Sequence, residues 1–148
     1  MTVIILLIGI QLIPVDRKNP PVTKEIAANE VARKVLKRAC YDCHSNETLW
    51  PWYSYVAPVS WLIARHVDHG RDRLNFSEWD KYSLRDKKHI LKDIPEEIEE
   101  GEMPMDNYLP LHPEAELSEE DIEALEKWVV ERKKDLVDQK VKNSNSVE

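Results

Sequence analysis

The chain has 148 residues, a length that predicts one domain, and its 42% apolar and 33% charged residues are typical of a soluble globular protein. Acidic residues (28) outnumber basic residues (21), and the net charge of −7 argues against nucleic-acid binding, which requires a basic face. Two cysteines exclude a disulfide framework, and three glycines leave no glycine-rich phosphate loop.

The first 15 residues are almost entirely apolar, and the first charge is that of Asp16. This run is shorter than the roughly 20 residues of a membrane-spanning helix, and it lacks a basic start and a cleavage site. We interpret residues 1–15 as an uncleaved signal or a membrane anchor, complete or lacking its first residues. An internal hydrophobic strand is the alternative. The prolines of residues 16–22 predict an extended spacer after this segment.

Residues 23–137 are expected to form the domain itself. Thr23 is a plausible N-cap of its first helix, whose apolar residues recur at helical spacing as far as Ala39. A second helix is expected from Pro58 to Gly70, because proline suits the first turn of a helix and glycine suits its end.

Ser83 begins a capping motif that predicts the next helix, which Pro95 either kinks or interrupts. A long loop is expected over residues 102–117. An acid-rich last helix begins near Ser118, and residues 138–148 are expected to form a disordered tail. The domain is therefore predicted to be all-α, with its first and last helices packed against each other.

The sequence Cys40-Tyr41-Asp42-Cys43-His44 is C-x-x-C-H, the attachment pattern of c-type haem. Two thiols at this spacing can each form a thioether with one porphyrin vinyl group, and the histidine that follows can donate an imidazole nitrogen to the iron. A dithiol redox motif is disfavoured because no βαβ pattern surrounds it, and a zinc site because no second cysteine pair exists. Cys40, Cys43 and His44 are thus predicted to hold one covalent haem c.

The opposite face of the iron needs its own ligand. Met103 and Met105 are the only methionines apart from the first residue, and both lie in the loop before the last helix. A thioether ligand raises the reduction potential relative to a second histidine. Met103 is preferred because Pro104 stiffens the loop and Gly101 permits a sharp turn before it. Met105 and His112 are the alternative distal ligands.

Other side chains are weaker candidates for contacts with the cofactor. His66 is a minor candidate for a second haem ligand. Aromatic residues that follow the motif either wall the cofactor or pack elsewhere: Trp50, Trp52, Tyr53 and Tyr55. Three arginines either neutralise haem propionates or are solvated: Arg65, Arg71 and Arg73.

These residues together resemble the haem-binding domain family of bacterial membrane-anchored monohaem c-type cytochromes. The resemblance spans roughly residues 19–132 and is carried by Cys40 to Thr48, Trp50-Pro51-Trp52-Tyr53-Ser54, Val56 to Trp61, Leu74 to Trp79, Gly101 to Pro104 and His112 to Ala115. It implies a cytochrome c-like helical fold, His44 as proximal ligand and Met103 as distal ligand. It also implies an anchor in the inner membrane and a domain on the periplasmic face. Where such proteins usually read Met-Pro-Pro, this chain has Met103-Pro104-Met105.

The expected function is single-electron transfer by Fe(III)/Fe(II) cycling, and no catalytic residue is predicted. The acidic surface favours a redox partner with a basic docking patch. A haem-based sensor or gas-binding module with a labile distal ligand is the alternative. A peroxidase is disfavoured because it needs an open distal site with acid–base groups.

Overall fold

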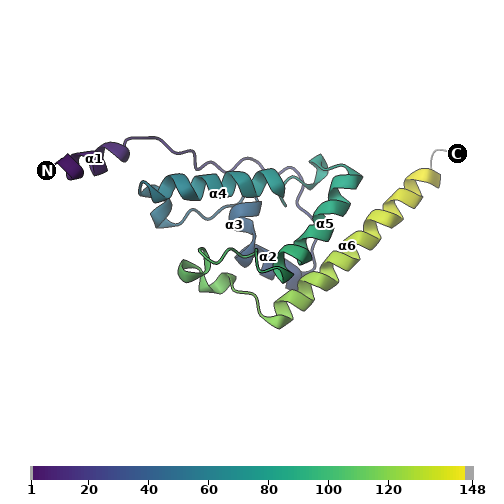
Figure 1. Cartoon of the computed structure of the whole chain (residues 1–148). Helices are drawn as coiled ribbons and strands as arrows, with labels where there is room; N and C mark the ends of the chain where they lie inside the picture. The colour runs from purple at the N-terminus through teal and green to yellow at the C-terminus, as the bar shows by residue number, and fades with distance from the viewer. Residues whose placement is uncertain (1, 146–148) are drawn as a thin grey trace.

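The computed structural model describes residues 2–145, which form six α-helices (Figure 1). They are α1 (Thr2–Ile10), α2 (Glu30–Ala39), α3 (Tyr41–His44), α4 (Val59–Arg73), α5 (Leu84–Glu99) and α6 (Glu119–Asn145), with short 3-10 turns between them. Within residues 2–145 there is no strand, and extended pairing is limited to an isolated bridge between Lys24 and Glu78. The predicted all-α fold is confirmed.

The hydrophobic core lies between α2, α5 and α6. α2 and α5 both pack against α6, so the predicted contact between the first and last helices of the domain is confirmed. Trp128 of α6 is completely buried, and its indole N–H donates to the Ala27 carbonyl at 2.9 Å. This hydrogen bond satisfies the one polar atom that the ring brings into the core. The buried residues around it are Ile26, Ala32, Val35, Leu36, Tyr41, Phe76, Leu91, Leu125, Val129 and Leu136.

The start of α2 differs from the prediction. Asn29, not Thr23, is the N-cap, and its side-chain oxygen accepts the Ala32 N–H at 3.0 Å. The residues from Thr23 onward are extended because their amides are used in a distant contact. The N–H groups of Thr23 and Lys24 both donate to the Ser77 carbonyl.

α4 also departs from the prediction, because it continues through Gly70 to Arg73. Gly70 is buried where α4 passes over α3, and a Cβ at this position would lie 2.5 Å from the carbonyl oxygen of Cys43. The glycine therefore permits close approach of two helices and does not end one of them.

Ser83 and Asp86 form the predicted capping box at the start of α5. The helix is continuous to Glu99, with Pro95 inside it. It ends where Gly101 adopts a φ of 75°, a left-handed conformation that glycine adopts without strain. The Gly101 N–H donates to the Ile98 carbonyl and the Glu102 N–H to the Glu97 carbonyl, the bonding pattern of a Schellman cap.

The described residues are helical at both ends. α6 extends to Asn145 in place of the disordered tail predicted from residue 138, because neither proline nor glycine interrupts this stretch; residues 146–148 lie outside the described residues. Residues 2–10 form a helix, not a strand, and none of its side chains is buried. Among the described residues, no helix is both long enough and apolar enough to cross a bilayer.

Candidate functional site

A cavity of about 850 Å³ lies between α3, α4, α5 and the loop that follows α5. Side chains from one face of α4 line this cavity, and so does a stripe of side chains along most of the length of α5. The cavity has a mixed lining with aliphatic, aromatic, sulfur-bearing and ionisable side chains: Ala39, Cys40, Asp42, Cys43, His44, His66, His69, Gly70, Arg73, Leu74, Phe76, Tyr82, Asp86, His89, Ile90, Asp93, Ile94, Glu97, Ile98, Met103, Pro104, Met105, Tyr108 and Leu117.

The C-x-x-C-H sequence forms the junction of α2 and α3. Cys40 ends α2 and begins α3, and its carbonyl accepts the His44 N–H at 2.9 Å. This single helical turn places Cys40, Cys43 and His44 along the cavity wall. The two thiols and the imidazole therefore face one shared space.

His44 has a defined protonation state. Its Nδ1 lies 2.9 Å from the Gly70 carbonyl oxygen and 3.1 Å from that of Leu74. Carbonyl oxygens only accept hydrogen bonds, so Nδ1 carries the proton and Nε2 keeps its lone pair. Burial lowers the pKa of His44 more than these two hydrogen bonds raise it, which keeps the ring neutral. A neutral imidazole with Nδ1 bound to backbone carbonyls is the usual form of a histidine that ligates a metal through Nε2.

The thiols are not in the state that dithiol chemistry needs. Burial, reinforced by Cys43, raises the pKa of Cys40 to about 12, and burial together with Asp42 raises that of Cys43 to about 11. Redox-active C-x-x-C motifs have lowered thiol pKa values instead. Within the described residues, no three histidine, cysteine or acidic side chains are arranged to hold a metal ion. The raised thiol pKa values thus disfavour the dithiol alternative.

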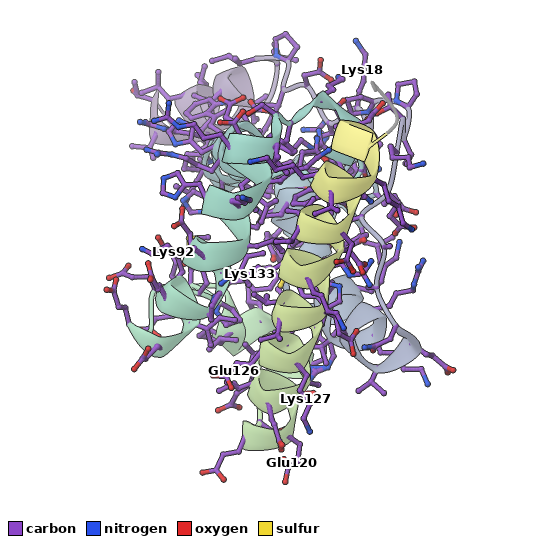
Figure 2. All side chains as sticks on the ribbon, turned by 90° about the vertical axis from the view of Figure 1, so that its right-hand side faces the viewer. Lys18, Lys92, Glu120, Glu126, Lys127 and Lys133 are labelled. Carbon is purple, nitrogen blue, oxygen red and sulfur yellow. The ribbon has the colours of Figure 1, made fainter. Side chains whose placement is uncertain are left out.

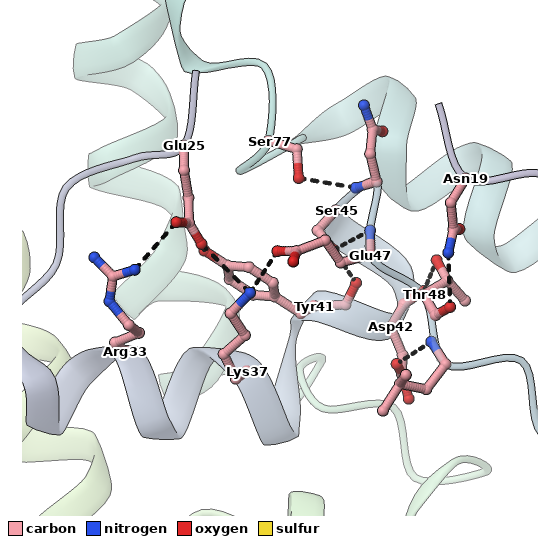
Figure 3. Close-up of polar contacts among 12 residues, drawn as sticks. Asn19, Glu25, Arg33, Lys37, Tyr41, Asp42, Ser45, Glu47, Thr48 and Ser77 are labelled. Carbon is pink, nitrogen blue, oxygen red and sulfur yellow. Dashed lines mark hydrogen bonds and ion pairs between the residues drawn. The ribbon is translucent and has the colours of Figure 1, made fainter. Parts of the chain in front are cut away.

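A polar network holds the motif against the rest of the chain (Figure 3). The Tyr41 hydroxyl donates to Glu25 at 2.8 Å, and Glu25 also pairs with Arg33 and Lys37. On the other side of the motif, the Thr48 hydroxyl donates to the Asp42 carbonyl at 2.8 Å. The turn that carries the cysteines is therefore held through both of the residues that lie between them.

The two methionines lie in the loop after α5, and both line the cavity. Met103 is 36% exposed, whereas Met105 is half-buried. The loop is tied to the cysteine motif by the Tyr108 hydroxyl, which donates to the Asp42 carboxylate at 2.8 Å. The thioethers and the imidazole thus line the same cavity from different elements.

His112, the third predicted distal ligand, is not among the cavity-lining residues. Its ring stacks on Tyr108 with centroids 4.0 Å apart. Its Nε2 lies 2.6 Å from the Tyr53 hydroxyl, and its Nδ1 lies 3.0 Å from the Glu114 carboxylate. Both ring nitrogens are therefore engaged, and the structure brings only the methionines, of the three candidates, to the cavity.

The sequence left open whether the aromatic residues after the motif wall the cofactor, and the structure decides against it. Trp50, Trp52, Tyr53 and Tyr55 do not line the cavity, and its aromatic side chains are Phe76, Tyr82 and Tyr108. The aliphatic contribution of α5 was also missed, although the four-residue spacing of Ile90, Ile94 and Ile98 is visible in the sequence.

Of the predicted arginines, Arg71 is bonded to the protein itself and Arg73 lines the cavity. Arg71 is fully engaged by the Ser45 and Lys18 carbonyls and by the side chains of Asn19 and Thr48. Arg73 lines the cavity together with His66 and His69, which occupy the same face of α4. Of the three arginines, Arg73 is therefore the one positioned to meet an anionic group inside.

The residues present fit a haem. The cavity lies within the roughly 300–1,000 Å³ that small-molecule and cofactor sites occupy. It combines a neutral imidazole with a free Nε2, two thioethers and two thiols with aliphatic and aromatic walls and one arginine. This donor set matches the axial ligation, apolar macrocycle and carboxylates of haem.

Comparison with protein families matches residues 5–131 to a family described as the haem-binding domain. Neither the comparison with curated proteins nor that with solved structures gave a match. The family match covers most of the chain, including every residue of the cavity. The chain therefore belongs to the haem-binding domain family and is a haem-binding protein.

Proposed function

We propose that the chain is a monohaem c-type cytochrome that carries single electrons outside the cytoplasm. The observation that carries the proposal is the placement of Cys40, Cys43 and His44 on one helical turn of the cavity wall, with two methionines at the same cavity. Haem binding by itself requires no cysteine, so the paired thiols beside the imidazole support covalent attachment.

Each residue has a separate task in this proposal. The sulfurs of Cys40 and Cys43 would hold the macrocycle, and Nε2 of His44 would donate to the iron. The Gly70 and Leu74 carbonyls keep the His44 ring oriented through Nδ1. Met103 is proposed as the distal ligand, with Met105 as the alternative. Haem, when bound, supplies a one-electron Fe(III)/Fe(II) couple.

The residues around the haem would adjust its reduction potential. A thioether ligand and the isoleucine side chains of α5 would both favour the ferrous state over the more highly charged ferric state. The carboxylates of Asp86, Asp93 and Glu97 on the same helix would oppose them. The hydrogen bond from Tyr108 to Asp42 keeps the methionine loop next to the cysteine turn, so both axial ligands are held by one linked unit.

The location and partner belong to the proposal as well. We propose that residues 1–15 attach the protein to the inner membrane, that residues 16–22 are the spacer and that the domain lies on the periplasmic side. The net charge of −7 supports weak, salt-sensitive docking on a basic patch of a redox protein.

A redox titration tests the carrier function. The haem-loaded protein should show a one-electron transition between two low-spin spectra, and the reduced form should not bind carbon monoxide at low concentration. Rapid carbon monoxide binding with a high-spin ferrous spectrum would overturn the proposal.

A haem-based sensor or gas-binding module is the second candidate. The exposure of Met103 favours it, because a small ligand can approach this thioether from solvent. Displacement of the methionine by carbon monoxide, with unchanged Cys40 and Cys43 attachment, would select the sensor over the carrier.

A further inference from the structure

We infer that residues 49–62 form a second lipid-contacting surface, which lies in the bilayer interface beside α1. This surface is called the 49–62 face. The inference rests on the proposed membrane attachment and extends it from the N-terminal segment to the body of the domain. It sets which side of the haem-binding domain lies on the lipid.

The 49–62 face is apolar and exposed. Leu49 and Trp52 are 78% and 77% exposed, the highest values among large apolar side chains outside α1 and the turn after it. Five more apolar side chains in this short segment are exposed as well: Tyr55, Val56, Val59, Trp61 and Leu62. Isolated exposed apolar residues are ordinary, but a run of this kind indicates a contact surface.

The same segment lacks negative charge. Residues 48–67 contain no aspartate or glutamate, although 28 of the 148 residues are acidic. Residues 2–15 contain no charge at all. Arg65 is the one charged residue inside residues 48–67, and Arg17 contacts this segment at Ser54 and Tyr55. Asp16, Glu47 and Asp68 border the two stretches but lie outside them. Phosphate headgroups of anionic lipids attract the two cations, and neither stretch contains a carboxylate that they would repel.

Hydrogen bonds place α1 and the 49–62 face at the same end of the molecule (Figure 1). The Gln11 side chain makes two hydrogen bonds with the backbone of Ala57, donating to its carbonyl at 3.1 Å and accepting its N–H at 2.9 Å. Arg17 donates to the Ser54 carbonyl and lies 4.4 Å from the centre of the Tyr55 ring. A bilayer that receives α1 therefore meets this face too.

The composition favours lipid over a protein partner. Two of the five tryptophans, Trp52 and Trp61, and one of the five tyrosines, Tyr55, are exposed in this segment. Tryptophan and tyrosine are enriched at the headgroup level because each ring has an apolar body and a polar tip. A redox partner with a basic patch would dock on acidic surface instead, such as the start of α6, where Glu120 and Glu126 lie (Figure 2).

Hydrogen–deuterium exchange of the full-length haem-loaded protein tests the inference directly. Exchange is compared with and without vesicles of phosphatidylcholine and phosphatidylglycerol. We expect slower exchange on vesicles in residues 2–13 and also in residues 49–62. Protection of residues 2–13 alone would overturn the inference and leave membrane attachment intact. Protection of neither segment would overturn both.

Paired variants supply the second measurement. Replacing Leu49 and Trp52 together by serine should weaken vesicle binding about tenfold, because interfacial binding scales with the apolar area inserted. The control replaces Val130 and Val137, two exposed valines of α6, by serine and should bind as the wild type does. Unchanged vesicle binding of the Leu49→Ser, Trp52→Ser protein, with slowed electron transfer to a protein partner, would assign the face to that partner and overturn the inference.

Discussion

Gly70→Ala is the substitution that perturbs the contact between α3 and α4 most directly. The added Cβ would lie 2.5 Å from the carbonyl oxygen of Cys43, 3.0 Å from its carbonyl carbon and 3.1 Å from its Cβ. Two of these atoms are backbone and the third is fixed to it, so none can rotate away. α3 must therefore shift relative to α4.

Three terms determine the effect on the free energy of unfolding. Overpacking in a well-packed site costs about 1–3 kcal/mol. The shift also loosens the hydrogen bond from His44 Nδ1 to the Gly70 carbonyl, which is worth about 1 kcal/mol. Alanine has the higher helix propensity, which restores about 1 kcal/mol. Gly70→Ala should thus destabilise the haem-loaded protein by about 1–3 kcal/mol.

Urea denaturation followed by far-UV circular dichroism measures this difference. Gly9→Ala in α1 is the matched control, because nothing lies within 4 Å of its added Cβ and alanine favours the helix, so its denaturation midpoint should not fall below that of the wild type. The haem absorption of Gly70→Ala should also change, since His44 loses its fixed orientation. Wild-type stability together with a wild-type spectrum would refute the proposed close contact of α3 with α4.

Three further changes test other parts of the site. Met103→Ala should abolish the far-red charge-transfer band of methionine-ligated ferric haem, and an unchanged band would exclude Met103 as the ligand. Tyr108→Phe removes the hydrogen bond to Asp42, so hydrogen exchange in the loop after α5 should accelerate about tenfold; unchanged exchange would contradict the tether. Burial raises the pKa of Glu25, but the Tyr41 hydroxyl and two basic neighbours outweigh it, and the net pKa is below 4.5. Because the pKa of Glu25 is lower in the folded than in the unfolded protein, its charge stabilises the fold at pH values above the unfolded-state pKa. The stability advantage of the wild type over Glu25→Gln should therefore shrink as the pH falls below about 4.5. A pH-independent difference would exclude this linkage.

Local chemistry made part of this structure predictable. The capping box of Ser83 and Asp86 and the turn at Gly101 depend only on neighbouring residues, so the boundaries of α5 follow from its sequence. The spacing of Cys40, Cys43 and His44 likewise places all three on one turn. The cysteines, His44 and the methionines come together at one cavity only because of how the helices pack. Helical periodicity in the sequence predicts the helices but not this packing.

Contacts between distant residues decided the rest. Thr23 has the chemistry of an N-cap, but the Ile26 N–H, which a cap at Thr23 would accept, donates to the distant Phe76 carbonyl at 2.9 Å. Glycine serves equally as a helix end and as a point of close approach, and only the position of α3 distinguishes these roles for Gly70. Amphipathic aromatics such as Trp52 pack inside or lie on the surface, and no local pattern separates the two. His112 is kept from the cavity by its stack on Tyr108.

The proposed function depends on covalent attachment of the haem to Cys40 and Cys43. Intact mass spectrometry under denaturing conditions measures this most directly, with protein produced in a host that matures c-type cytochromes. We expect a single species heavier than the polypeptide by one haem, and the bare polypeptide mass for the Cys40→Ser, Cys43→Ser double variant. Wild-type protein that loses its haem on denaturation and has the mass of the polypeptide alone would contradict the claim.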